Sequence, residues 1–388
     1  MVACPSAVAE NQPANKHRMN IELYRFAARL RESINSSFKN ENFDALALEL
    51  FALQFKYNSG YKKICEARRL TPPVVEHWTQ IPAVPTAAFK ELELTSLAPD
   101  ERVAVFHSSG TTEQKPSRHF HSEESLAVYE TALWNWYELH FGGDGELIFL
   151  TPNPIAAPHS SLVHMFETIR GKMAPPESVF TGNVSTDASW TVDFAATIQK
   201  LNAAAKTKIP MTLLGTAFSF VHLLDHLAEN NLCFQLPENS RAMETGGYKN
   251  RSRVLPKTEL HALITERLGI PPGKIFCEYG MSELSSQAYS VTSDEWQVTS
   301  TSDAARHSSL VTHHFKFPPW ARVQVISPET SREVCDGESG LIRIFDLANV
   351  FSVAAIQTED LGVCRGDGFE LIGRAQMAEP RGCSLMTA

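Results

Sequence analysis

Hydrophobic positions near the N-terminus of the chain recur at helical spacing. The apolar stripe of this region consists of Phe43, Leu46, Leu50 and Leu53. Asp44 falls off this stripe, as expected for a helix with one buried and one solvated face. The pattern predicts helices over residues 20–70, and prolines at 72, 73, 82 and 85 then break the chain into a connector.

From about residue 100 the pattern changes to short apolar runs that alternate with longer amphipathic ones. Strands are expected at 102–106, 146–150, 211–214 and 274–278, and helices at 122–136, 218–227 and 257–268. Alternation of strands and helices at this spacing predicts an α/β body with a largely parallel sheet. Beyond Trp320 the pattern turns to β-like segments at 322–326 and 340–345.

These changes of pattern divide the chain into five regions. We expect a disordered tail over 1–19, a helical segment over 20–99, the α/β body over 100–320, a β-rich subdomain over 321–375 and a flexible tail over 376–388.

Composition narrows the class of protein. The chain has 388 residues, a formal charge of −9 and 20% charged residues, which excludes wholesale disorder and argues against nucleic-acid or anionic-membrane partners. Its seven cysteines are dispersed without metal-like spacing, and the N-terminus lacks an apolar signal segment. No apolar run approaches the roughly 18–20 residues of a membrane span. We therefore expect a cytoplasmic protein.

The most informative stretch is the loop at residues 107–118, which follows an expected strand. It contains four hydroxyl residues around Gly110 and ends with the cations Lys115 and Arg118. Backbone amides and hydroxyls in such a loop can surround phosphate oxygens, while cations offset their charge. The Walker A pattern is absent. By composition alone, an ordinary polar surface loop explains the stretch equally well.

Five stretches in order resemble the motifs of the AMP-forming, adenylate-forming ligase superfamily. Ser108–Thr112 resembles its phosphate loop, with Glu113 where the family usually has glycine. The other four are the glycine turn in Glu244–Tyr248, the Tyr-Gly segment Glu278–Glu283, Thr358–Asp360, and Gly373-Arg374. The resemblance covers roughly residues 100–385 and implies that residues 100–320 are an AMP-binding body.

The resemblance also implies a role for each matching residue, with ATP and Mg²⁺ as cofactors. The β- and γ-phosphates would be held by Ser108, Ser109, Gly110, Thr111, Thr112 and Arg118. Ser282 would contact the α-phosphate and Glu283 would bind Mg²⁺. The adenosine side would involve Gly246, Gly247, Tyr279, Gly280, Asp360 and Arg374, with Asp360 on the ribose hydroxyls.

Features near the end of the chain point to one branch of the superfamily. Only 14 residues follow Arg374, so we expect no full C-terminal lid domain. The segments Arg381–Leu385, Pro154–Met165 and Pro318–Trp320 resemble the acyl-protein synthetase (LuxE-type) branch, which contains the long-chain-fatty-acid–luciferin-component ligases. In that branch a cysteine near the C-terminus accepts the acyl group, and Cys383 would take this role.

The resemblance therefore implies an ATP-dependent ligase that forms acyl-AMP from a carboxylic acid. A fatty acid is the expected substrate, and long-chain fatty, short-chain and aryl acids all stay open. The acyl group would pass to Cys383 and then to a partner protein, a reductase or a carrier. His159 and His164 are both candidates for an acyl-pocket histidine. Three alternatives stay open: an acyl- or aryl-CoA ligase, an adenylation enzyme that loads a carrier protein, and a non-catalytic nucleotide-binding protein with Cys383 as a spectator.

Overall fold

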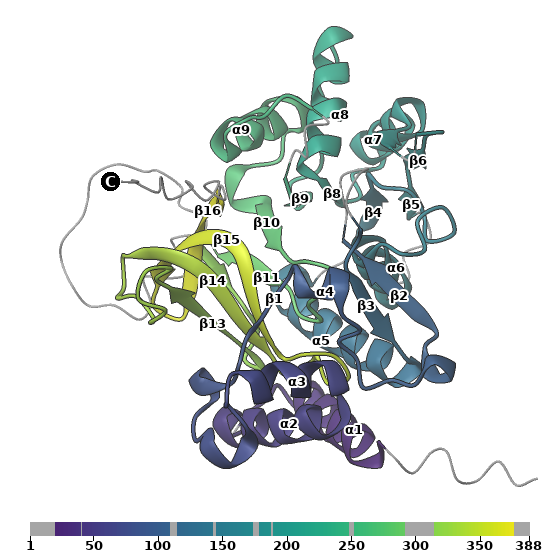
Figure 1. Ribbon diagram of the computed structural model, residues 1–388. Helices are drawn as coiled ribbons and strands as arrows, with labels where there is room; N and C mark the ends of the chain where they lie inside the picture. The colour runs from purple at the N-terminus through teal and green to yellow at the C-terminus, as the bar shows by residue number, and fades with distance from the viewer. Residues whose placement is uncertain are drawn as a thin grey trace, which may run out of the picture.

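The computed structural model describes residues 20–39, 41–108, 115–142, 145–173, 178–187, 189–247, 252–291 and 314–375 (Figure 1). Both expected tails lie outside these residues, and Cys383 with them. Four expected phosphate-loop residues, Ser109, Gly110, Thr111 and Thr112, also lie outside the described residues.

The N-terminal segment is helical, as its apolar spacing predicts. It contains α1 (Ile21–Asn35), α2 (Phe43–Tyr57), α3 (Ser59–Ala67), the two-residue strand β1 (Val84–Pro85) and α4 (Ala88–Glu91), with short 3-10 turns at Pro72–Val74, Trp78–Gln80 and Pro99–Glu101. Asn42 and Asn58 cap α2 and α3, because their side-chain oxygens accept the backbone N–H groups of Ala45 and Tyr61. Leu46 and Leu53 lie at the margin of the buried face of α2 rather than at its centre.

The central part alternates strands and helices. It comprises β2 (Ala104–His107), β3 (Arg118–His121), α5 (Glu123–Phe141), β4 (Glu146–Phe149), α6 (Ser161–Met173), β5 (Val179–Phe180), β6 (Gly182–Val184), β7 (Trp190–Val192), α7 (Phe194–Thr207), β8 (Met211–Thr216), α8 (Ala217–Glu229), β9 (Arg241–Thr245), α9 (Lys257–Leu268), a 3-10 turn (Pro272–Lys274), β10 (Ile275–Tyr279) and β11 (Ala288–Val291). The last part holds β12 (His314–Lys316), β13 (Ala321–Ile326), β14 (Ser339–Asp346), β15 (Ala355–Arg365) and β16 (Gly368–Arg374).

One twelve-stranded sheet runs through both parts. Its order is β13-β14-β15-β16-β12-β11-β10-β9-β8-β4-β5, and β1 pairs with β15. The strands from β5 to β10 run parallel, whereas those from β10 to β13 pair antiparallel. The α/β fold is confirmed, and strands on both sides of residue 320 belong to this sheet.

Alternate residues of the parallel strands enter two separate cores. Leu213 and Ala242 pack with α7, α8 and α9, whereas Leu214 and Met243 pack with α5 and α6. Buried parallel strands need apolar side chains on both faces, which explains the continuous apolar run of β8. The helices thereby cover both faces of the parallel half (Figure 1).

The helices α1–α3 gather beneath strands β13–β15 (Figure 1) and share one core with them. A polar contact fixes this packing: the buried Gln54 amide donates to the carbonyls of Asn349 and Val350, at 2.7 and 3.2 Å. Its oxygen accepts the N–H of Ala354 at 3.1 Å. The turn between β14 and β15 has backbone groups that no neighbouring strand satisfies. One side chain, Gln54, forms hydrogen bonds with three of them.

The pattern missed strand β3. Arg118–His121 pairs antiparallel with β2, so the loop of residues 107–118 closes a β-hairpin rather than leading straight into a helix. The expected N-cap is nevertheless correct, since the hydroxyl of Ser122 accepts the N–H of Ser125 at the start of α5. None of the helices given above combines the length and apolar character that crossing a membrane requires.

We predict that Gln54→Leu destabilises the protein by about 2–3 kcal/mol, because it leaves buried backbone groups without partners. Urea unfolding followed by circular dichroism measures the change. The matched control is Gln199→Leu on the exposed side of α7. Equal unfolding midpoints for the two variants would show that the turn does not depend on Gln54.

Candidate functional site

The two ends of the β2–β3 hairpin meet the segment that follows β10. The backbone N–H of Ser108 donates to Ser117 Oγ at 3.2 Å, and the N–H of Ser117 donates to Ser108 Oγ at 3.1 Å. Ser117 Oγ lies 3.3 Å from Ser282 Oγ. The base of the expected phosphate loop is therefore in hydrogen-bond contact with the serine expected at the α-phosphate.

Ser282 and Glu283 are held rigidly in a buried turn. Ser282 Oγ donates to Glu283 Oε2 at 3.0 Å, and Asn349 Nδ2 donates to the Glu283 carbonyl at 2.9 Å. His119 Nδ1 lies 2.9 Å from the Ser282 carbonyl oxygen, which can only accept, so this nitrogen carries the proton. Burial lowers the pKa of His119 to about 4, which keeps the ring neutral.

Asp346, at the end of β14, fixes the residues just beyond this turn. Its carboxylate accepts the backbone N–H groups of Ser285 and Ser286, at 3.0 and 2.8 Å, and the Ser286 hydroxyl at 2.7 Å. It also accepts the N–H of Ala348 at 2.9 Å. Burial raises the pKa of Asp346 to about 6, and these donated bonds act against that rise.

Glu283 fits the expected role of a magnesium ligand. Its carboxylate is buried, and within the described ranges no lysine, arginine or histidine forms an ion pair with it. Carboxylate and hydroxyl oxygens, as supplied by Glu283 and Ser282, are donors that a hard cation such as Mg²⁺ prefers. A bound cation would supply the positive charge that balances this buried carboxylate.

A second group of expected residues meets at the ends of β10, β15 and β16. Tyr279 Oη donates to Asp360 Oδ2 at 2.8 Å, and Arg374 Nε lies 3.6 Å from Asp360 Oδ1. Asp360 and Arg374 stand opposite each other in the β15–β16 pair. Burial raises the pKa of Asp360, while the Tyr279 hydroxyl and the Arg374 charge oppose this effect.

The glycine turn lies beside Tyr279. Thr245 at the end of β9 is paired with Glu278 on parallel β10, so Gly246 and Tyr279 leave the sheet at the same edge. Gly246 has φ of +69°, a conformation that favours glycine, and a Cβ added at Gly246 or Gly247 would contact nothing within 4 Å. The carboxyl ends of parallel strands are where α/β sheets bind ligands.

The two cations of the hairpin loop face carboxylates of the connector. Arg118 lies 3.8 Å from Glu93 Oε1 and Lys115 lies 3.7 Å from Glu91 Oε2. Arg102 also binds Glu93, at 3.0 Å, and this hydrogen bond lowers the pKa of Glu93. The expected phosphate contact of Arg118 therefore requires its weak contact with Glu93 to be exchanged for one with phosphate.

The two candidate acyl-pocket histidines lie on either side of β2. His159 stacks on His107 with ring centroids 4.7 Å apart, and its Nδ1 lies 3.1 Å from the Val105 carbonyl. His164 contacts Glu130 at 3.1 Å, and its ring lies 5.6 Å from that of Tyr129. Of the two, His164 is the one that lies against the aromatic core beneath α5.

Comparison with protein-family models gives a match to "Acyl-protein synthetase, LuxE" over residues 28–388. The chain belongs to this family. The expected resemblance is confirmed, and the expectation of an AMP-forming ligase agrees with it.

Two curated relatives carry the name long-chain-fatty-acid–luciferin-component ligase. The one from Aliivibrio fischeri is 25% identical over 363 residues, covering 89% of this chain and 87% of the relative. The one from Vibrio harveyi is 25% identical over 347 residues, covering 86% and 84%.

Among solved structures, a 2-hydroxyisobutyryl-CoA ligase in complex with 2-HIB-AMP and CoA is similar at a TM-score of 0.58 and 11% identity. The match covers 90% of this chain and 69% of that one. A second structure of that ligase, in the postadenylation state with R3-HIB-AMP, matches at a TM-score of 0.58 and 13% identity, covering 95% and 73%. These likenesses show that this family member has the fold of an adenylate-forming ligase.

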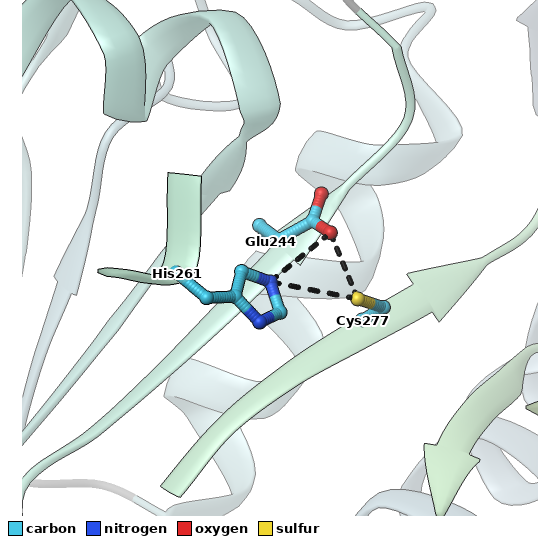
Figure 2. Close-up of side chains that lie close together, drawn as sticks. All are labelled: Glu244, His261 and Cys277. Carbon is cyan, nitrogen blue, oxygen red and sulfur yellow. Dashed lines mark hydrogen bonds and ion pairs between the residues drawn. The ribbon is translucent and has the colours of Figure 1, made fainter. Parts of the chain in front are cut away.

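Behind the glycine turn of this acyl-protein synthetase family member lies a buried group of Glu244, His261 and Cys277, whose side chains point toward one another in Figure 2. Cys277 Sγ lies 2.9 Å and His261 Nε2 lies 3.7 Å from Glu244 Oε1. Lys257 Nζ, however, lies 2.6 Å from the same oxygen. The cation of this cluster is thus the Lys257 ammonium. It occupies the side of Glu244 Oε1 that a metal ion would need in order to bind this oxygen.

The ion pair sets the charge of Glu244. Burial opposes its ionisation, but the Lys257 charge and hydrogen bonds from His261, Cys277 and Lys257 outweigh this and lower its pKa to about 2. Glu244 lies two residues before the glycine turn, and Lys257 is the first residue of α9. The ion pair therefore holds the end of β9 next to the start of α9.

Several residues that build the candidate site were not expected from the motifs. Ser117, His119, Asp346 and Asn349 all contact the Ser282–Ser286 segment, yet each lies far from it in the sequence. The pair His119–His121 was visible as a pattern, but nothing local indicated that both rings are buried.

We predict that Lys257→Met destabilises the protein by about 2–3 kcal/mol, below the full cost of breaking a buried pair because Lys257 is one-third exposed. The double variant Glu244→Gln/Lys257→Met should lose less than about 1 kcal/mol, since no buried charge remains. Thermal and urea unfolding measure both, with Lys206→Met on the exposed face of α7 as control.

The difference in stability between the wild type and the double variant should depend on pH, because the pKa of Glu244 is lowered in the folded protein. The contribution of the pair is fully present above the ordinary pKa of 4.5 and is lost as the pH falls toward 2. A stability difference between wild type and the double variant that does not change between pH 7 and pH 3 would contradict the assignment.

Proposed function

We propose that this chain is an ATP-dependent acyl-protein synthetase. It activates a carboxylic acid as acyl-AMP with release of pyrophosphate, transfers the acyl group to Cys383, and passes it to a partner protein. The family description and the ligase names of the two relatives support this proposal. ATP and Mg²⁺ are the cofactors that the proposal requires.

The observation that carries the proposal is the convergence of motifs that lie far apart in the chain. Ser108 and Ser282 are joined through Ser117 at one end, and Tyr279 and Asp360 are bonded at the other. Only two residues separate Tyr279 from Ser282, so a phosphate-binding end and a ribose-binding end share one turn. This is the arrangement that a mononucleotide with its phosphate chain needs.

In the first step, a carboxylate oxygen of the acid attacks the α-phosphorus of ATP. The bond from this phosphorus to the bridging oxygen breaks, and pyrophosphate leaves. Ser282 and the Ser108 end of the hairpin would orient the phosphates, which is the main requirement of phosphoryl transfer. Mg²⁺, when held by Glu283, supplies positive charge for the phosphate oxygens.

In the second step, the Cys383 thiolate attacks the carbonyl carbon of acyl-AMP, AMP leaves, and a thioester remains. The two buried cysteines of the described ranges are poorly suited to this role. Cys277 is buried on the α9 side of the sheet, and burial raises its pKa well above the ordinary value. Burial also raises the pKa of Cys65 to about 11. The resemblance of Arg381–Leu385 to the LuxE-type branch supports Cys383 as the candidate.

We predict that Glu283→Gln lowers carboxylate-dependent exchange of pyrophosphate into ATP at least about 100-fold, because it removes a ligand charge aimed at the transition state. Glu229→Gln, an exposed position at the end of α8, is the matched control and should retain full activity. An absence of exchange by the wild-type protein across a broad panel of acids would contradict adenylation itself.

We predict that Cys383→Ala keeps pyrophosphate exchange but loses the labelled acyl-enzyme thioester, since only the second step needs the thiol. Denaturing gels with radiolabelled acid, read before and after hydroxylamine, measure the thioester. Cys335→Ala, which removes an exposed cysteine, is the control. Label that persists in Cys383→Ala, or AMP release that requires free CoA, would assign the acceptor elsewhere.

A further inference from the structure

The hydroxyl of Tyr279 joins two parts of the sheet that are not neighbours. Tyr279 ends β10, whereas Asp360 lies on β15, and strands β11, β12 and β16 stand between them in the order of the sheet. The side chain bridges this separation, because Tyr279 Oη donates to Asp360 Oδ2 at 2.8 Å. The acid expected at the ribose is thus held by a residue of the parallel half of the sheet.

The ring of Tyr279 lies among phenylalanine side chains of the intervening region. Its centroid is 6.0 Å from that of Phe315, 6.3 Å from that of Phe317 and 5.1 Å from that of Phe369, and the last two rings meet it edge to face. Only 7% of Tyr279 is exposed. Such packing fixes the direction of the hydroxyl and leaves little of the ring surface for a base to stack on.

The chain that carries Asp360 is fixed as well. The backbone N–H of Asp360 donates to Thr358 Oγ1 at 3.1 Å, and this hydroxyl donates to the Ile342 carbonyl at 2.7 Å. Because the backbone is held in this way, the direction of the carboxylate depends on the contacts of its two oxygens.

These two oxygens have different surroundings. Oδ2 accepts the Tyr279 hydroxyl, whereas Oδ1 lies 3.6 Å from Arg374 Nε, which is longer than a hydrogen bond. The Arg374 side chain is 81% exposed, so a ligand can displace it readily. A carboxylate has about four acceptor positions, and this one therefore keeps enough of them to accept two hydroxyl groups.

The bond from Tyr279 also favours the charged form of Asp360. Burial and, to a smaller extent, the neighbouring Glu359 raise the pKa of Asp360, while the Tyr279 hydroxyl and the Arg374 charge act in the opposite direction. A donated hydrogen bond stabilises the carboxylate relative to the carboxylic acid. The carboxylate is the form that accepts from two donors at once, as the vicinal hydroxyls of a ribose are.

Tyr279 is continuous with the phosphate-binding end of the candidate site. Only two residues separate it from Ser282, whose Oγ lies 3.3 Å from Ser117 Oγ. The Tyr279–Asp360 bond therefore sets how far the acid on β15 lies from the turn at Ser282. A nucleotide that contacts both has to match this separation.

We propose that Tyr279 is a positioning residue for ribose: its hydroxyl holds the Asp360 carboxylate where it accepts the 2′- and 3′-hydroxyls of ATP, and its ring is not the stacking surface for adenine. This inference rests on the proposed function, because it takes ATP to be the nucleotide bound. The two roles differ in the part of the side chain that matters. Positioning needs the hydroxyl, whereas stacking needs only the ring.

Calorimetric titration of the full-length protein with ATP and with 2′,3′-dideoxy-ATP tests the proposal. The wild type should bind ATP at least about tenfold more tightly, because a site that hydrogen-bonds a hydroxyl rejects the analogue that lacks it. Tyr279→Phe keeps the ring, so it should weaken ATP binding about tenfold and leave binding of the dideoxy analogue unchanged. Tyr24→Phe on α1 removes a hydroxyl that donates to Glu101 Oε1 at 3.0 Å, and it is the matched control.

Two further measurements ask whether the hydroxyl acts through Asp360. Asp360→Asn should bring the two affinities close together, and adding Tyr279→Phe to it should then change their ratio no further. In pyrophosphate exchange with the best acid of the panel, Tyr279→Phe should raise KM for ATP about tenfold and keep kcat within about twofold. Melting temperatures are measured for every variant, and all titrations are run well below the lowest of them.

The outcomes separate the possible causes. An equal loss of affinity for both nucleotides in Tyr279→Phe, or a loss for neither, overturns the positioning role. A selective loss that persists undiminished beside Asp360→Asn also overturns it, because the hydroxyl then acts on another group. Equal binding of the two nucleotides by the wild type removes the ribose contact of Asp360 and leaves adenylation intact. If ATP binds but no acid supports exchange, the proposed function fails, and the calorimetric ratios still decide the role of Tyr279. If ATP does not bind, both proposals fail.

Discussion

The Ser282–Ser286 segment, where phosphate binding is proposed, depends on the hydrogen bonds that one buried carboxylate accepts. Asp346 accepts backbone hydrogen bonds from Ser285 and Ser286 and so fixes the chain just after Glu283. In the same turn, Asn349 holds the Glu283 carbonyl, while its own carbonyl accepts from Gln54. A buried carboxylate without its donors is costly, so the turn and the Ser282–Ser286 segment have to form together. The N-terminal helices and the site residues thereby share one structural support.

The sheet separates two glutamates that lie on adjacent strands. Because side chains alternate along a strand, Glu244 faces α9 with Cys277, whereas Glu278 faces α5 with Tyr289. Lys257 pairs with Glu244 and keeps the pKa of Glu244 at about 2. Glu278 forms no ion pair with a lysine, arginine or histidine of the described ranges, and burial raises its pKa to about 7. Two acids of the same type thus have pKa values shifted in opposite directions, and their surroundings decide the direction of each shift.

The sequence predicted the α/β class, the capped helix after Ser122 and the strand that ends at Tyr279, because apolar periodicity and local capping encode them. It missed β3, whose four residues carry two histidines and an arginine rather than an apolar alternation. The motifs named Tyr279 and Asp360, but their direct hydrogen bond joins residues 81 positions apart and depends on strand order. Glu278 lies inside the Tyr-Gly motif segment, yet only its packing on the α5 side of the sheet shows that it is buried.

The in-register pairing of Asp360 with Arg374 has a geometric consequence for the end of the chain. Ala375 donates its backbone N–H to the Glu359 carbonyl and is thereby tied to the strand that carries Asp360. Cys383 lies eight positions after Ala375, and a fully extended chain of that length spans at most about 28 Å. Under the proposed transfer, the Cys383 thiol lies within this reach of the edge that carries Asp360, and a partner protein that collects the acyl group would have to approach that edge.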